Sequence, residues 1–200
     1  MASRRLHIII AAMDQRPTLE TLLDRAALLA EGGDLTGAYA AARQALDLRP
    51  DARRALILAA RLALAAGRHD DAARHAREAA HPNPGDAEVA LLSGQVALAA
   101  GTLPEAVESL QRAVRLSPDD AAARLTLGRA WIAAAEPEKA LPHLRRAVAL
   151  DPSDSLDARA WLAVAEDGPA ADLPSDFIRA LFDQYADKFD DELRGTLGYR

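Results

Sequence analysis

The chain has 200 residues, of which half are apolar and only 4% aromatic, and its 24 basic and 30 acidic residues give a formal charge of -6. The apolar share comes mainly from Ala and Leu, which favours packed helices, since strands prefer β-branched and aromatic residues. No basic stripe is present to neutralise phosphates, and the chain has no cysteine, so the composition argues against a nucleic-acid partner and excludes disulfides and thiolate chemistry.

The first 18 residues are interpreted as an N-terminal leader or cap built on Ile8, Ile9 and Ile10. Two arginines precede this apolar block, as in a signal peptide, but charged residues follow it directly and no small-residue cleavage site is evident. No apolar run approaches the roughly 18 residues of a membrane-spanning helix. The sequence therefore predicts a cytoplasmic protein with no membrane contact. Its strong preference for Arg over Lys indicates a bacterial, GC-rich source.

Proline recurs every 34 residues, at Pro50, Pro84, Pro118 and Pro152. Alignment on these prolines gives four units without insertions, 19–52, 53–86, 87–120 and 121–154. In every unit position 8 holds Ala or Gly, and positions 20 and 27 hold Ala. Small side chains at these points allow the two helices of a hairpin to approach closely. The period predicts four helical hairpins, whose first helices span about 19–31, 53–66, 87–100 and 121–134.

The expected helix ends are also marked in the sequence. Position 15 holds Gly in three units and Ala135 in the fourth, which predicts a left-handed turn between the two helices of each hairpin. Pro142 lies inside the second helix of the fourth unit, where it removes one backbone hydrogen bond. Aspartates follow the proline column, and we expect each to cap the next first helix: Asp51, Asp86, Asp120 and Asp154.

The small residues at positions 8, 20 and 27, together with proline at position 32, resemble the tetratricopeptide-repeat family over residues 19 to 154. The resemblance implies an all-α fold, a tetratricopeptide-repeat solenoid in which antiparallel helix pairs form a right-handed superhelix. It also implies a protein-protein interaction scaffold that binds a protein or peptide partner. We expect the solenoid to span 19–167 and to end in a capping helix, 154–167, that carries Trp161 and Leu162.

In this family a concave groove, lined by first-helix positions 5, 9 and 12 among others, binds peptides. The resemblance implies these groove residues here: Leu23, Ile57, Arg61, Leu64, Leu91, Gln95, Leu98, Leu125, Arg129 and Ile132. The Lys and Asn residues with which some members clamp a chaperone's C-terminal carboxylate are not present at the matching positions. The alternative is that part of this apolar surface is ordinary core between repeats.

The last segment has a different composition. A turn-rich linker, 168–175, leads to residues 176–200, which contain all three phenylalanines. Apolar residues at spacings of three and four predict an amphipathic helix there. Its apolar face is the candidate docking surface, made of Ile178, Leu181, Phe182, Tyr185, Phe189 and Leu193. We expect the last repeats, a second copy of the chain or a further domain to cover this face.

The phrase LFDQYADKFDDELRGTLGYR resembles the junction that precedes the catalytic domain in tetratricopeptide-repeat proteins with a class I S-adenosylmethionine-dependent methyltransferase domain. This resemblance implies that the chain is the N-terminal, non-catalytic region of such a methyltransferase-like protein. The alternative is a freestanding adaptor that binds peptides or self-associates. Reading the gene past Arg200 would distinguish the two.

No pattern in the chain predicts an enzyme, a cofactor or a metal site. The serines lack a GxSxG turn, and the acidic cluster near Asp190 lacks the glycine and spacing of a calcium loop. His69, His75 and His81 are six residues apart, so successive side chains point in different directions around a helix. We interpret all three as surface histidines.

Overall fold

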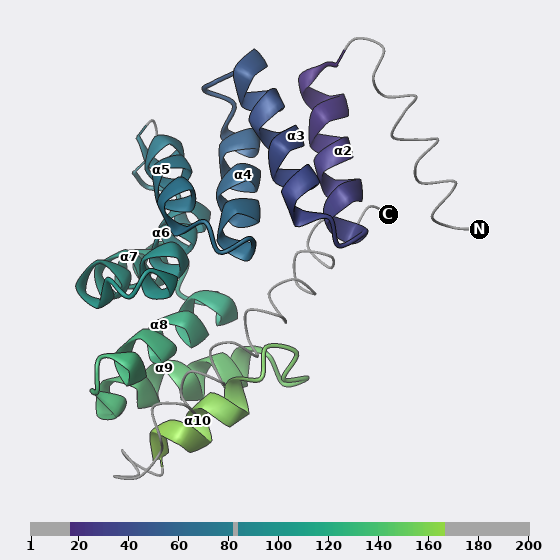
Figure 1. Cartoon of the computed structure of the whole chain (residues 1–200). Coiled ribbons are helices and arrows are strands. Elements are labelled where there is room, and N and C mark those ends of the chain that lie inside the picture. Colours follow the sequence, from purple (N-terminus) through teal and green to yellow (C-terminus); the bar gives the residue numbers. More distant parts are fainter. Residues whose placement is uncertain (1–16, 82–83, 167–200) are drawn as a thin grey trace. The chain divides into compact units, whose positions relative to one another are not determined.

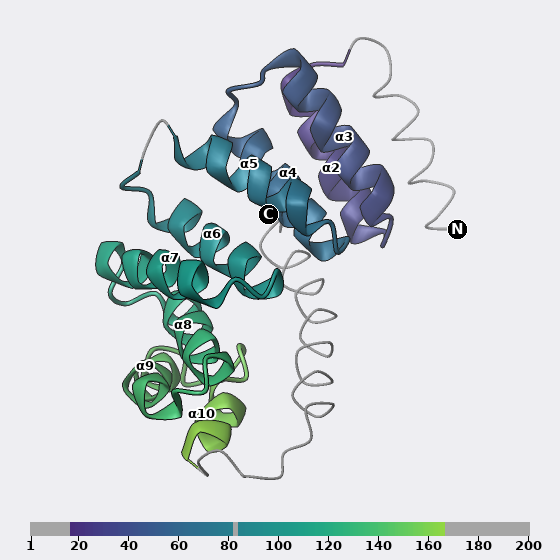
Figure 2. The same ribbon diagram turned by 60° about the vertical axis from the view of Figure 1, so that its left-hand side comes forward.

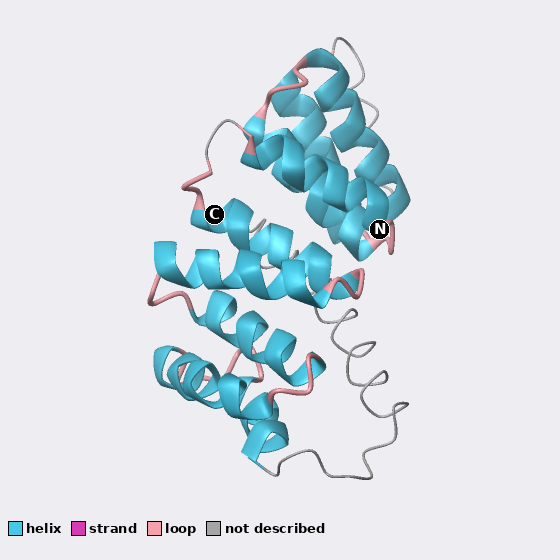
Figure 3. Ribbon diagram, turned by 90° about the vertical axis from the view of Figure 1, so that its left-hand side faces the viewer, coloured by secondary structure: helices cyan, strands magenta, loops and turns pink. Residues whose placement is uncertain are grey.

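The computed structural model describes residues 17–81 and 84–166, and within these ranges every regular element is an α-helix (Figures 1 and 3). The leader up to residue 16, the linker 168–175 and the predicted amphipathic helix in 176–200 lie outside the described residues. The helices are α2 (Leu19–Glu31), α3 (Leu35–Leu48), α4 (Arg53–Ala65), α5 (His69–Ala80), α6 (Ala87–Ala99), α7 (Leu103–Leu116), α8 (Ala121–Ala133), α9 (Pro137–Leu150) and α10 (Ala158–Glu166).

Consecutive helices form antiparallel hairpins, which confirms the all-α repeat architecture. The chain divides into two compact units, of which one contains α2 to α5 and the other α6 to α10. Figure 2 shows α2 beside α3 and α6 beside α7, and both pairs are in contact. Each expected first helix begins at the predicted residue and ends at most one residue early. None of the described helices is both long and apolar enough to cross a membrane.

The turns between paired helices follow from position 15. Gly33, Gly67 and Gly101 all have positive φ angles, and Ala135 adopts the same left-handed conformation at φ 58°. This conformation lets the chain reverse within three residues, so that the second helix returns along the first. The left-handed turn is thus confirmed in all four hairpins, including the one that lacks glycine.

Three of the four predicted aspartates accept a hydrogen bond from the first turn of the next helix, Asp86 and Asp120 at the N-cap position and Asp154 from before it. The Asp86 carboxylate accepts hydrogen bonds from the backbone N–H groups of Glu88 and Val89, and Asp120 accepts one from Ala123. Asp51 does not cap α4, because the cap position falls on Ala52 and no side chain caps that helix. The reason is positional, since Asp51 stands one place earlier in its unit than Asp86 and Asp120 do in theirs.

Position 8 determines how closely the two helices of a hairpin pack. A Cβ atom added to Gly94 would lie 2.4 Å from Cγ of Leu110, and one added to Gly128 would lie 2.5 Å from Cγ of Leu144. Both leucines are fully buried. At the corresponding positions the first two repeats pair alanines, Ala26 with Ala42 and Ala60 with Ala76. Leucine therefore occurs only where its partner is glycine.

The last described helix departs from the period. Two residues separate the proline from the next first helix in the other repeats, whereas five separate Pro152 from Ala158. The capping helix thus begins at Ala158, four residues after the expected start. In the inserted turn Asp154 and Asp157 both have φ 55°, a conformation that aspartate tolerates better than most residues. Asp154 also accepts a hydrogen bond from the backbone N–H of Arg159.

The side chain of Asp151 holds this inserted turn together. Its carboxylate accepts hydrogen bonds from the Ser155 hydroxyl at 2.8 Å and from the backbone N–H of Leu156 at 3.2 Å. The hydrogen bonds from Ser153 and Ser155 hold the pKa of Asp151 below its usual value. The turn places α10 against α9 and α8, where Trp161 is buried.

Candidate functional site

In the unit of α6 to α10, the expected groove residues lie on α6 and α8, the first helices of the third and fourth repeats. They differ in exposure, because Leu125 is only 5% exposed, whereas the other five are half-buried: Leu91, Gln95, Leu98, Arg129 and Ile132. The half-buried residues keep part of their surface available for a ligand, while Leu125 contributes to the interior.

Part of this apolar surface is also core between repeats. Leu91 and Leu98 pack against the buried cluster shared by α7 and α8, which includes Leu110 and Leu127. Leu91 also contacts a second buried cluster, which contains Ala113 and Ala123. The alternative interpretation of the apolar surface as core therefore applies to the buried part of these two half-buried leucines, which stabilises the stacking of the third repeat on the fourth.

Arg129 is held in place by an aromatic ring from the capping helix. Its guanidinium carbon lies 4.9 Å from the centroid of the Trp161 ring, and Trp161 is 1% exposed. A guanidinium over an indole face is attracted by the ring quadrupole. Arg145 of α9 also forms a 3.0 Å ion pair with Glu166 of α10. The capping helix therefore orients the one basic side chain among the expected groove residues of this unit.

The unit of α2 to α5 carries the other four expected groove residues, on α2 and α4. Leu23 and Ile57 are 6% and 5% exposed, so these side chains belong mainly to the interior. Arg61 and Leu64 of α4 are half-buried. The two positions farther along α4 thus offer more surface than the position 5 residues do.

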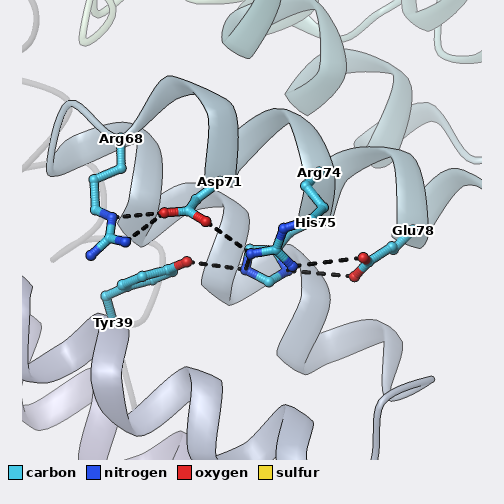
Figure 4. A network of polar contacts seen from close by, with 6 residues as sticks. All are labelled: Tyr39, Arg68, Asp71, Arg74, His75 and Glu78. Atoms are coloured by element: carbon cyan, nitrogen blue, oxygen red, sulfur yellow. Dashed lines mark hydrogen bonds and ion pairs between the residues drawn. The ribbon is translucent and has the colours of Figure 1, made fainter.

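A buried polar network joins α3 to α5 in the same unit, and no sequence pattern indicated it (Figure 4). The Tyr39 hydroxyl lies 3.2 Å from Nε2 of His75. Their rings meet edge to face at 6.0 Å between centroids. Both side chains are 2% exposed. The interpretation of His75 as a surface histidine is therefore wrong, because position 23 of this repeat faces the second helix of the preceding one.

Charged side chains surround this pair. The Arg68 guanidinium covers the Tyr39 ring at 4.6 Å from its centroid, and Asp71 accepts hydrogen bonds from Arg68 at 2.8 Å and Arg74 at 2.9 Å. These bonds, that from Arg74 foremost, hold the pKa of Asp71 below its usual value. Burial raises the pKa of Tyr39. Burial, followed by the charge of Arg74, lowers the pKa of His75.

The other unit has a histidine at the same repeat position. His143 of α9 is half-buried, and its pKa is lowered by burial and by the charge of Arg124. Within the described residues its Nδ1 atom has no hydrogen-bond partner. Position 21 of the preceding repeat, which holds Tyr39 in the first unit, here holds Val107. His143 can therefore be compared with His75, because it has the same repeat position but the preceding repeat offers it a valine in place of the tyrosine.

The remaining predicted site residues cannot be placed here, since Ile178, Leu181, Phe182, Tyr185, Phe189 and Leu193 all lie outside the described residues. Among the residues that are described, no three His, Cys, Asp or Glu side chains come together in a way that could hold a metal ion.

Comparison with known proteins agrees with the helical repeat fold described above. A family model for the tetratricopeptide repeat matches residues 28–96 and 97–166. No curated protein matches the sequence significantly. Among solved structures, TTC0263, a thermophilic tetratricopeptide-repeat protein of Thermus thermophilus, is 22% identical over 90% of this chain and 97% of its own, with a TM-score of 0.66.

Structures of the MamA protein resemble this chain with similar identity, coverage and TM-score. A MamA structure from Desulfovibrio magneticus RS-1, starting at its residue 41, is 22% identical over 76% of this chain and 87% of its own, with a TM-score of 0.66. Another MamA crystal structure is 20% identical over 88% of this chain and 89% of its own, with a TM-score of 0.64. At these identities the likeness establishes the fold alone.

Proposed function

We propose, from the premise that the chain belongs to the tetratricopeptide-repeat family, that its first helices bind an extended peptide segment of a partner protein. The family consists of protein-binding scaffolds. The observation that carries the proposal is the mixed character of the half-buried residues on α4, α6 and α8. Apolar side chains there supply contact area, and polar side chains beside them can bond to a peptide backbone or an acidic residue.

In the unit of α6 to α10, Leu98 and Ile132 would contact apolar side chains of the peptide. Gln95 can both donate and accept hydrogen bonds, so it suits a peptide backbone. Arg129 can donate two parallel hydrogen bonds to a carboxylate, and its stacking on Trp161 reduces the entropy it would lose on binding. In the other unit, Arg61 and Leu64 provide the same combination of charge and apolar surface.

The test is selection of binding peptides from a random displayed library on the full chain. We expect peptides that combine apolar residues with an acidic residue, and weaker binding after the double substitution Arg61→Ala and Arg129→Ala. The matched control substitutes two arginines of second helices, Arg77→Ala in α5 and Arg115→Ala in α7. Equal loss of binding in both double variants, or crosslinks only to second helices, would contradict the proposal.

The freestanding adaptor is the form of this function that we favour, with self-association as its variant. Sedimentation of the purified chain at several concentrations distinguishes a monomeric adaptor from a self-associating one. The methyltransferase connection depends only on the phrase in residues 181–200, which lie outside the described residues. It stays a prediction, and a Rossmann-like domain encoded downstream in the gene would support it.

A further inference from the structure

His75 occupies a position where the first repeat meets the second. It lies on α5, and Tyr39 lies on α3, so their 3.2 Å contact joins the second helices of two successive repeats. Both side chains are buried. The contact is separate from α2 and α4, which carry the expected groove residues of this unit.

One neighbour of His75, Arg74, favours its neutral form. The two terminal nitrogens of Arg74 lie 3.5 Å from Nδ1 and 3.3 Å from Nε2 of His75. Arginine can only donate hydrogen bonds, and a neutral imidazole has one nitrogen that accepts. An imidazolium has none, so its N–H groups would face those of Arg74. The Tyr39 hydroxyl could then only accept a hydrogen bond from Nε2–H of His75.

The charges that act on His75 itself have both signs. Among the described residues, Arg74 opposes a charge on the ring, whereas Glu78 and Asp71 of the same helix favour it. Arg43 of α3 and Arg68 act on Tyr39. Asp71 already accepts hydrogen bonds from two arginines, Arg68 and Arg74. Glu78 lies 3.6 Å from Nδ1, but its side chain is 47% exposed, so water screens its attraction.

We propose that the contact between Tyr39 and His75 holds the second repeat on the first at neutral pH and is lost in mild acid. Neutral His75 keeps α5 packed on α3. When mild acid protonates the imidazole, repulsion from Arg74 and the cost of a buried charge release the contact. This contact lies on the second helices, so acid would regulate the stacking of the two repeats without altering a side chain of the proposed peptide surface.

The first test is amide hydrogen exchange of the full chain at about pH 7.5 and about pH 5.5, corrected for the intrinsic effect of pH. In the wild type, we expect peptides from α3 and α5 to lose protection severalfold at the lower pH. In His75→Gln, which keeps an uncharged hydrogen-bonding group, the response of these peptides should disappear. The control His81→Gln changes an exposed histidine just after α5 and should respond like the wild type.

The same response in wild type and His75→Gln, or no response at α3 and α5 in the wild type, would overturn the proposal. The second test, an NMR titration of the histidine rings in the wild type, keeps the proposal falsifiable if His75→Gln does not fold. We expect His75 to titrate below about 6.5, the value for an unperturbed histidine, with the Tyr39 ring signals shifting at the same midpoint. Titration of His75 at or above that value, with unchanged Tyr39 signals, would also overturn it.

Discussion

Leu110 fills the space that a side chain at Gly94 would need, since a Cβ atom there would lie 2.4 Å from Cγ of Leu110. The fourth repeat repeats this relationship with Gly128 and Leu144. The first repeat has an alanine on each side instead. The hairpins thus fill this position in two ways, with a leucine against a glycine or with one methyl group on each helix, and the pair of residues, rather than either alone, sets the fit.

Gly94→Ala should therefore destabilise the chain by roughly 1–3 kcal/mol, because Leu110 must shift within a packed core. Leu110→Ala alone should cost about 2–5 kcal/mol through the cavity it leaves. The double variant recreates the alanine pair of the first repeat, so its cost should be clearly below the sum. Urea unfolding followed by circular dichroism measures all three variants, and strictly additive costs would contradict the paired fit.

Stability should decrease as the pH falls from neutral through about 6.5, the value for an unperturbed histidine. Both His75 and His143 have lowered pKa values in the folded chain, so the unfolded chain binds protons first and gains stability relative to the folded one. The loss should end below the folded pKa values. Melting temperatures across this range measure it, and His143→Gln should remove part of the slope. A slope that persists in a variant lacking both histidines would rule out this origin.

Two carboxylates should make the stability of the fold decrease again in a second, more acidic pH range. Asp71 and Asp151 have lowered pKa values because hydrogen bonds favour their charged forms. Their contribution to stability is present above about 3.8 and is lost as the pH falls below that value. Asp71→Asn should reduce the acid sensitivity in this window alone. Melts between about pH 5 and pH 2 would show whether the loss depends on Asp71.

Trp161 should be the main anchor of the capping helix. Trp161→Ala should cost about 3–5 kcal/mol, because it empties a buried site and removes the ring under Arg129. Arg145→Ala is the matched control on the same interface. Its ion pair with Glu166 is formed by side chains that are 60% and 47% exposed, so its loss should cost less than about 1 kcal/mol. Limited proteolysis near α10 combined with thermal melts would separate the two, and equal effects would contradict the anchor.

The amphipathic helix predicted in residues 176–200 lies outside the described residues, and its apolar face stays a candidate docking surface. If the face that contains Phe182 and Phe189 packs on the terminal repeats, deletion of residues 174–200 should lower the melting temperature. An unchanged melt, together with proteolytic cleavage throughout the tail of the full chain, would show instead that the segment does not dock on this chain.

The repeat period was enough to predict the first helices almost to the residue, because small side chains, glycine turns and prolines recur at fixed positions. The exception at Asp51 could have been predicted as well, because this aspartate stands one place earlier in its unit than Asp86 and Asp120 do and so misses the cap position. The sequence could not show that five residues, rather than two, precede α10. Local signals predict which turns are possible, but the hydrogen bonds of Asp151 that hold this turn, and the buried position of Trp161 after it, are seen only in the structure.

The candidate site was harder to predict for a related reason. Family positions identified a helix face, but burial along that face varies with the neighbouring side chains, so Leu125 and Leu98 differ although both belong to it. The contact between Tyr39 and His75 joins residues 36 positions apart. No spacing within one helix predicts such a pair, because its partners are set by the stacking of repeats.

The three extra residues before α10 have a consequence for protein engineering. Repeats of constant length can be joined end to end because each presents the same face to the next. Here that equivalence ends at Pro152. An array designer who adds a fifth complete repeat should leave two residues between Pro152 and its first helix, as in the other repeats, and omit the turn that Asp151 organises. A repeat fused after Glu166 would begin out of phase, so its first helix would present the wrong side to the array.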